Sequence, residues 1–455
     1  MWKINNNINK AKPSLKAGFL ILLLLVVVTA IVSVVFQKYI FIPLFLLLVC
    51  VSLFVSKKIF NTYFSPLGVM GVTWLLPSLL TFLNPKWELK EETWLVILGS
   101  FLVFVVGVFS ASLGHKFQGL KLPTITSKKN IEYWDKPFLD KTIAILFCLG
   151  IVGFVINMWH IISAGGIKIY FQEGFRAGEL IFGSNTLINY LYFLNMVVVP
   201  LVVLRTIAYG KNFLLSFIGI ISFLMLFSHG IKSTVIMTTV IAFWVLVLVR
   251  QRVLLKHIVI VGIIVFAAFI LVSVGRDSGQ FFTQDFHFTN LLYLGTDRVY
   301  HYIVPNYANL QQELLRRNQY LLGKDTFASL IELFSFRQVK PQIQYYLVDE
   351  AYNVGTYLRP FVVDFGIAGI IIGPLLIGFL TNFIFLVFLK KPSLFNLFFY
   401  AIAITTVTFS FWSPQLLRIQ FIYFIVILYF IELVRRTSRK YHKAIKLTLT
   451  RYNNG

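Results

Sequence analysis

The sequence predicts an all-α protein, a polytopic membrane bundle of about twelve transmembrane helices. Of its 455 residues 58% are hydrophobic and only 13% are charged, and the mean hydropathy is +0.80. Soluble domains are far more polar than this. Since backbone polar groups find no water inside a bilayer, a chain of this composition is expected to cross it as helices, forming a single integral-membrane domain over residues 1–455.

Twelve apolar segments approach the length of about 20 residues that a helix needs to cross a bilayer core. Pro77 interrupts the third segment and is expected to kink it. In chain order the segments are 17–36, 39–55, 65–83, 94–113, 142–164, 187–209, 212–227, 233–249, 257–274, 366–389, 394–412 and 417–433.

Basic residues predict how these segments are oriented. The first segment is too long for a signal-peptide core and has no A-x-A-like site after it, so we interpret it as an uncleaved anchor. The amino-terminal end and a basic tail over residues 434–455 flank the first and last segments, and both are expected to be cytoplasmic. With twelve spans, the cytoplasmic loops and ends hold most of the 41 Lys and Arg residues and few of the 18 Asp and Glu residues. The net charge of +23 therefore indicates orientation in a bacterial inner membrane and attraction to anionic lipid, and not nucleic-acid binding.

Two segments on the predicted outer side are long, 165–186 and 275–365. The second, a large extracytoplasmic loop, is rich in aromatic residues. These could stack on sugars or form an interfacial belt, and the belt is the simpler interpretation. Leucines at helical spacing around Leu310 and Leu330 predict short amphipathic helices at the membrane interface.

The candidate site consists of arginines in these outer segments. A guanidinium group makes forked hydrogen bonds to phosphate oxygens, so several arginines could hold a diphosphate without a metal. Each could instead contact lipid headgroups or pair with an acidic neighbour. The five candidates are Arg176, Arg276, Arg298, Arg337 and Arg359.

Histidines supply further candidates. His229 and Lys232 lie in the short turn between the seventh and eighth segments, where they could contact a phosphate or simply end helices. His301 is the loop histidine best suited to accept a proton near neutral pH, although an interfacial histidine with satisfied hydrogen bonds is the simpler interpretation. Weaker candidates for that role are His160, Asp297 and Glu350.

Several chemistries lack their motifs. The sequence has no P-loop, no H-E-x-x-H, no C-x-x-C and no D-x-D pair. We therefore expect neither a cofactor nor a metal. Gly369 and Gly373 form a G-x-x-x-G pattern that indicates close helix packing and not a binding site.

The stretch NVGTYLRPFVVDFGIAG, residues 353–369, resembles the hallmark of the Wzy-type oligosaccharide repeat unit polymerases. That family shows an N-V-x-T-Y segment and a D-F-G-x-x-G segment where the large outer loop ends and the next span begins. Gly355 departs from the bulky residue common in the family, and Lys232 stands where an arginine is common. The likeness to the O-antigen ligases is more distant.

The resemblance implies an activity: polymerisation of undecaprenyl-diphosphate-linked repeat units into O-antigen of lipopolysaccharide, capsule or exopolysaccharide of the cell envelope. It implies that Arg176, Arg276 and Arg359 bind the diphosphate, and that Asn353, Tyr357 and Asp364 anchor the loop or contact sugar. A flippase and a chain-length regulator are implied as partners. An O-antigen ligase and a transporter of lipid-linked sugars remain the alternatives.

Overall fold

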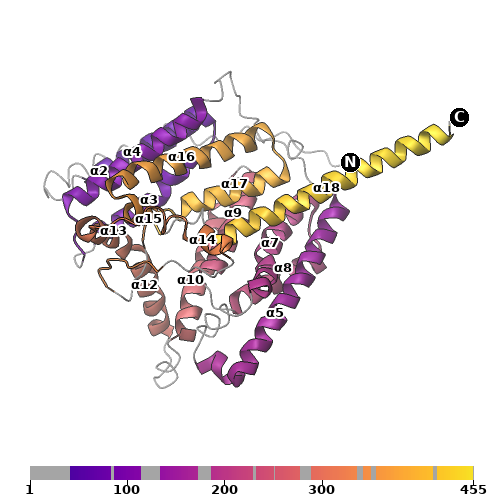
Figure 1. Ribbon diagram of the computed structural model, residues 1–455, viewed down its shortest axis with the longest axis horizontal. Helices are drawn as coiled ribbons and strands as arrows, with labels where there is room; N and C mark the ends of the chain where they lie inside the picture. The colour runs from indigo at the N-terminus through magenta and orange to yellow at the C-terminus, as the bar shows by residue number, and fades with distance from the viewer. Residues whose placement is uncertain are drawn as a thin grey trace.

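The computed structural model describes residues 41–83, 87–113, 134–172, 186–228, 232–250, 252–276, 288–335, 342–349, 355–412 and 418–453. Within these ranges the chain is all-α and contains no strand, as predicted (Figure 1). The helices are α2 (Phe41–Phe60), α3 (Pro66–Phe82), α4 (Glu91–Leu113), α5 (Lys136–Gln172), α7 (Thr186–Tyr209), α8 (Phe213–Ser228), α9 (Lys232–Arg250), α10 (Leu255–Arg276), α12 (Phe288–Ile303), α13 (Pro305–Arg316), α14 (Ala328–Phe334), α15 (Leu358–Phe365), α16 (Ile367–Lys390), α17 (Leu394–Thr408) and α18 (Ile419–Asn453).

Each expected apolar segment from 39–55 onward coincides with one of these helices, whereas 17–36 lies outside the described residues. In the described part of the chain, six helices are long and apolar enough to cross a membrane: α2, α4, α5, α7, α9 and α16. Shorter apolar helices occur in α3, α8, α10 and α17. The chain is therefore a membrane protein. Twelve crossings remain a prediction.

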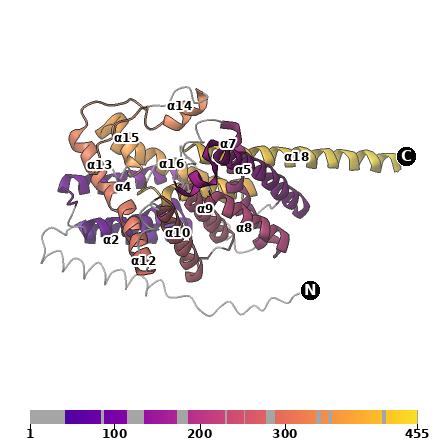
Figure 2. The same cartoon turned by 90° about the horizontal axis from the view of Figure 1, so that it is seen from below.

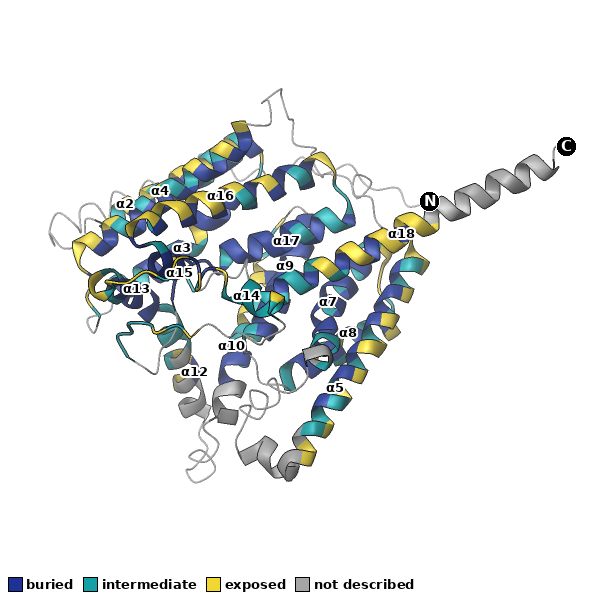
Figure 3. Cartoon of the chain, in the orientation of Figure 1, coloured by how far each residue is buried: buried dark blue, intermediate teal, exposed yellow. Residues whose placement is uncertain are grey.

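Large apolar side chains on the outer helix faces fit this conclusion. On α4, Leu95, Leu102 and Val106 are 61%, 53% and 56% exposed. Figure 3 shows such exposed positions along the outer edges of α4, α5 and α16, while α9 and α17 are mostly buried. Exposed apolar surface on this scale is unfavourable in water but is solvated by lipid.

Glycines allow the bundle helices to approach closely. A Cβ atom on Gly107 of α4 would lie 2.3 Å from the Leu375 carbonyl oxygen of α16, and one on Gly378 of α16 would lie 2.4 Å from the Phe104 carbonyl oxygen of α4. Small residues at such crossings are typical of helix pairs in membranes, where dispersion contacts drive association.

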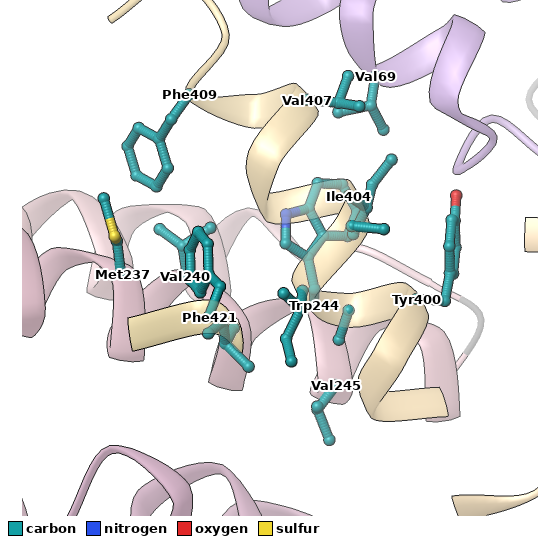
Figure 4. Close-up of a cluster of buried hydrophobic side chains, with 14 of the residues drawn as sticks. Val69, Met237, Val240, Trp244, Val245, Tyr400, Ile404, Val407, Phe409 and Phe421 are labelled. Atoms are coloured by element: carbon teal, nitrogen blue, oxygen red, sulfur yellow. The ribbon is translucent and has the colours of Figure 1, made fainter. Parts of the chain in front are cut away.

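The centre of the bundle is filled by large side chains of α9 and α17. Trp244 packs against Ile404 in the cluster that Figure 4 shows, and its indole N–H donates to the Thr408 hydroxyl at 3.0 Å. A buried tryptophan needs such an acceptor for its one polar group.

The helices of segment 275–365 gather on one side of the bundle. In Figure 2, α13, α14 and α15 lie together along one edge, and α12 runs from them toward α10. The two short amphipathic helices predicted around Leu310 and Leu330 are present as α13 and α14.

Helix α13 was expected to lie at the membrane interface with its polar face in water. In the structure this polar face is buried inside the protein. Gln311 accepts hydrogen bonds from the Lys90 N–H at 2.7 Å and from the Thr93 hydroxyl at 2.9 Å. Asn309 accepts one from the Val348 N–H at 2.9 Å. Buried polar groups need such partners, and α13 thereby connects α4 to the segment 342–349.

Helix α18 is held to Trp134, which lies just before α5, and Trp134 is in turn held to the end of α7. The carboxylate of Glu432, itself 3% exposed, accepts from the Trp134 indole at 2.9 Å and from Arg435 at 2.9 and 2.7 Å. The Tyr209 hydroxyl, at the end of α7, donates to the Trp134 carbonyl at 2.6 Å. We call Trp134, Tyr209, Glu432 and Arg435 the Trp134 clamp.

Candidate functional site

A polar cavity of about 210 Å³ lies where segment 275–365 meets the start of α18. Its wall combines two cations, one carboxylate, one phenol and three hydroxyl groups. These belong to Arg359, Arg418, Asp325, Tyr345, Thr326, Ser329 and Thr356. The described residues of the wall thus carry more positive than negative charge, which suits an anion better than a metal ion.

The turn that carries Asp325 is held by the end of α15. The Asp364 carboxylate, fully buried, accepts hydrogen bonds from the backbone N–H groups of Asp325 at 3.0 Å and of Thr326 at 2.6 Å. The N–H groups of Leu321 and Leu322 donate to the carbonyls of Val363 and Asp364. Asp364 therefore fixes the backbone on which the cavity carboxylate is mounted.

The segment that carries Tyr345 is held by α13. The buried Glu313 carboxylate accepts from the Tyr346 N–H at 2.9 Å and from Arg317 Nε at 2.7 Å. Arg317 also donates to the Gln344 carbonyl. Backbone on both sides of Tyr345 is thus bound to α13 and its end, and the phenol reaches the cavity.

Arg359, on the first turn of α15, lies over the ring of Tyr345, with 4.1 Å between its guanidinium carbon and the ring centroid. Such a cation–π contact holds a cation in place without neutralising it. Burial lowers the pKa of Arg359, and Tyr345 and Asp325 oppose that effect. The group stays cationic at neutral pH.

Gly355 leaves room for this arrangement. A Cβ atom there would lie 2.5 Å from Arg359 Nε. The departure from the bulky residue of the resembled family therefore has a local reason in this chain, because any side chain at position 355 would displace the guanidinium group.

Asp325 is the carboxylate of the cavity. Its Oδ1 accepts a hydrogen bond from the Tyr345 hydroxyl at 2.7 Å, whereas its Oδ2 is buried and has no hydrogen-bond partner among the described residues. Burial raises the pKa of Asp325 to about 6, against the lowering effects of the Tyr345 hydrogen bond and the Arg359 charge. Asp364 and Glu313 raise the pKa further.

This raised pKa predicts that Asp325 costs stability at neutral pH. A carboxyl group whose pKa is higher in the folded state favours folding while it is protonated, and this contribution is lost as the pH rises through about 6. We expect Asp325→Asn to increase the free energy of unfolding in detergent at pH 7.5 by up to about 3 kcal/mol, and so to raise the unfolding temperature. The gain should shrink at pH 4.5, and an equal gain at both pH values would contradict this account.

No protein-family model matches the chain. Neither a curated protein nor a solved structure matches it either.

The structure brings one of the predicted arginines, Arg359, into the cavity. Four of the predicted site residues, Arg176, Arg337, His229 and Asn353, lie outside the described residues. Arg276 ends α10, Arg298 lies on α12 and Lys232 begins α9, with side chains outside the described part.

The other predicted residues do not line the cavity. His301 lies on α12, where its Nδ1 contacts the Asp297 carboxylate at 3.1 Å and its ring meets Trp87. Tyr357 is fully buried against Trp74, and its N–H donates to the Ser410 carbonyl at 2.8 Å. Tyr357 and Asp364 were expected either to anchor the loop or to contact sugar. The contacts described for both residues are made within the protein and hold the loop in place.

Sequence reasoning missed Arg418, Asp325 and Tyr345. Arg418 carries the carbonyl that accepts the first hydrogen bonds of α18, from Phe421 and Ile422. In the sequence it looks like a charge at the end of an apolar helix. A signal was present, because a basic residue at the outer end of the last predicted span runs against the distribution of charge elsewhere.

Proposed function

We propose that the chain is a membrane glycosyltransferase that joins lipid-diphosphate-linked oligosaccharide repeat units into polysaccharide. The observation that carries the proposal is one cavity lined by both Arg359 and Arg418. Fixed guanidinium groups stabilise the negative charge that develops on a diphosphate as its bond to sugar breaks. The hydroxyl groups of Thr326, Ser329 and Thr356 add hydrogen-bonding capacity for a sugar.

The proposal includes a topology. We infer twelve membrane crossings, both termini in the cytoplasm, and segment 275–365 on the extracytoplasmic face of the inner membrane. A lipid carrier embedded in that face would present its diphosphate at headgroup depth, next to a cavity that lies outside the apolar helices. The resemblance of residues 353–369 to the repeat unit polymerases supports the choice of donor.

The direct test supplies purified protein in liposomes with undecaprenyl-diphosphate-linked repeat units and separates the products by size. We expect a ladder of polymers from the unchanged chain. Arg359→Ala and Arg418→Ala should each reduce its formation on the order of 100-fold, since each removes a cation aimed at the leaving group. Arg359→Lys should recover only part of the activity, because lysine keeps the charge but loses the forked geometry.

Arg316→Ala is the matched control, since Arg316 is exposed on α13 and does not line the cavity. It should leave the ladder unchanged. A ligase would give no ladder from repeat units alone and would need a second acceptor. A transporter would move the lipid-linked repeat across the bilayer without changing its size. Long polymers from both cavity variants would refute the diphosphate role.

A further inference from the structure

The cavity places an acid–base group beside the two cations. Asp325 shares the wall with Arg359 and Arg418, and its Oδ2 is the buried oxygen without a hydrogen-bond partner among the described residues. Thr326, next to it, has a second such oxygen, Oγ1. Buried polar atoms are satisfied almost everywhere in folded proteins, so two neighbouring exceptions in one cavity mark a place where a polar ligand would complete the hydrogen bonds.

The remaining oxygen of Asp325 is held in a defined position. Tyr345 donates to Oδ1 from one side, and the backbone around Asp325 is fixed by Asp364 from the other. The carboxylate of this cavity-lining residue is therefore oriented, with Oδ1 occupied and the buried Oδ2 without a hydrogen-bond partner among the described residues. A group that transfers a proton must be positioned in this way before its acidity matters.

On the basis of the proposed function, we propose that Asp325 is the proton acceptor for the attacking hydroxyl of the acceptor sugar. In the step, the hydroxyl oxygen forms a bond to the anomeric carbon of the donor and its proton passes to Asp325 Oδ2. The bond between the anomeric carbon and the phosphate oxygen breaks, and its electron pair leaves with the diphosphate, whose added charge Arg359 and Arg418 stabilise.

The electrostatic surroundings suit this role. In the part of the chain that the structure describes, the carboxylate is surrounded by these titratable or charged groups: Tyr345, Arg359, Asp364, Glu313 and Arg418. Burial dominates them and raises the pKa of Asp325 to about 6. The group is thus ionised at neutral pH yet more basic than an ordinary aspartate, as an efficient general base should be.

His301, the histidine expected from the sequence, is less suited to the step. It contacts Asp297 on its own helix and does not line the cavity with the two arginines.

The test measures turnover as a function of pH for the full-length protein in liposomes. Turnover of the unchanged chain should rise with pH through about 6. Asp325→Asn keeps the shape and an acceptor for the Tyr345 hydroxyl, so it should bind the lipid-linked donor within about 3-fold of normal yet lose on the order of 100-fold or more in turnover. Asp325→Glu should restore part of the turnover.

Tyr345→Phe gives an independent measurement. It retains the ring beneath Arg359 but removes the hydrogen bond that lowers the pKa of Asp325. Its acid limb should therefore move to higher pH, and turnover at the plateau should fall less than in Asp325→Asn, because Asp364 still holds the backbone that carries the carboxylate. Glu332→Gln makes the same carboxylate-to-amide change on α14 outside the cavity wall and should change neither turnover nor the limb.

The outcomes separate this inference from the proposed function. If the unchanged chain makes a ladder, and Asp325→Asn makes it equally fast with the same pH dependence, Asp325 is not the proton acceptor while the polymerase proposal stands. If Asp325→Asn loses donor binding together with turnover, its role is structural and the inference is again overturned. If the unchanged chain makes no ladder from authentic donor, the proposed function itself falls and takes the inference with it.

Discussion

Replacing Asp364 by alanine is expected to release the turn that carries Asp325 and to abolish the proposed transferase activity. The Asp364 carboxylate is fully buried and accepts two backbone hydrogen bonds, at 3.0 and 2.6 Å. Alanine leaves both N–H groups without a partner, at about 1–3 kcal/mol each. We expect unfolding in detergent to become easier by about 3–5 kcal/mol, and hydrogen exchange of the amides of Asp325 and Thr326 to accelerate.

Asp364→Asn should be intermediate, because one amide oxygen can still accept while the NH₂ group faces the other donor. Glu332→Ala, a carboxylate change on the adjacent α14, is the control and should alter stability by less than about 1 kcal/mol. Unchanged exchange at 325 and 326 in Asp364→Ala would show that the turn is held by other contacts.

The second large effect is expected at the crossing of α15 and α16. A Cβ atom on Gly369 would lie 2.0 Å from the Phe361 carbonyl oxygen and 2.4 Å from its carbonyl carbon. Because the obstacle is backbone, Gly369→Ala must push α15 away from α16, and α15 carries Arg359. Overpacking of this kind costs about 1–3 kcal/mol. If Arg359 binds the leaving diphosphate as proposed, a shift of about 1 Å there should reduce turnover on the order of 100-fold.

Gly99→Ala is a close match for this substitution. Gly99 lies within α4, and no described atom beyond its own turn of helix lies within 4 Å of a Cβ atom built on it. The control should be neutral or slightly stabilising, since alanine favours a helix over glycine by about 1 kcal/mol. Full activity and unchanged stability in Gly369→Ala would mean that the two helices separate more easily than their contact indicates.

The helices were largely predictable from the sequence, because apolar runs determine where a chain can lie in lipid. Their ends were less so. The helix predicted over 142–164 extends to Lys136–Gln172 as α5, and the last one continues through the basic tail to Asn453. Polar residues beyond the apolar run do not stop either helix, and α5 also continues through Gly165 and Gly166. Pro77 does not end α3 either, which runs through it.

The site was predictable only in part. Arg359 lies in a stretch with a distinctive pattern, and Gly369 and Gly373 confirm the close packing that their spacing indicated, since both adjoin Phe361. Asp325 and Tyr345 carry no local signal. They come together because Asp364 and Glu313 bind backbone groups more than 30 residues away in the chain, and sequence patterns do not report such partners.

One consequence follows from α18. Its first backbone acceptor belongs to Arg418, in the cavity wall, and its Glu432 belongs to the Trp134 clamp, about 21 Å farther along the same unbroken helix. A straight rod of hydrogen-bonded backbone does not stretch. The Trp134 clamp therefore fixes the position of α18 along its axis, and with it the position of Arg418 in the cavity wall.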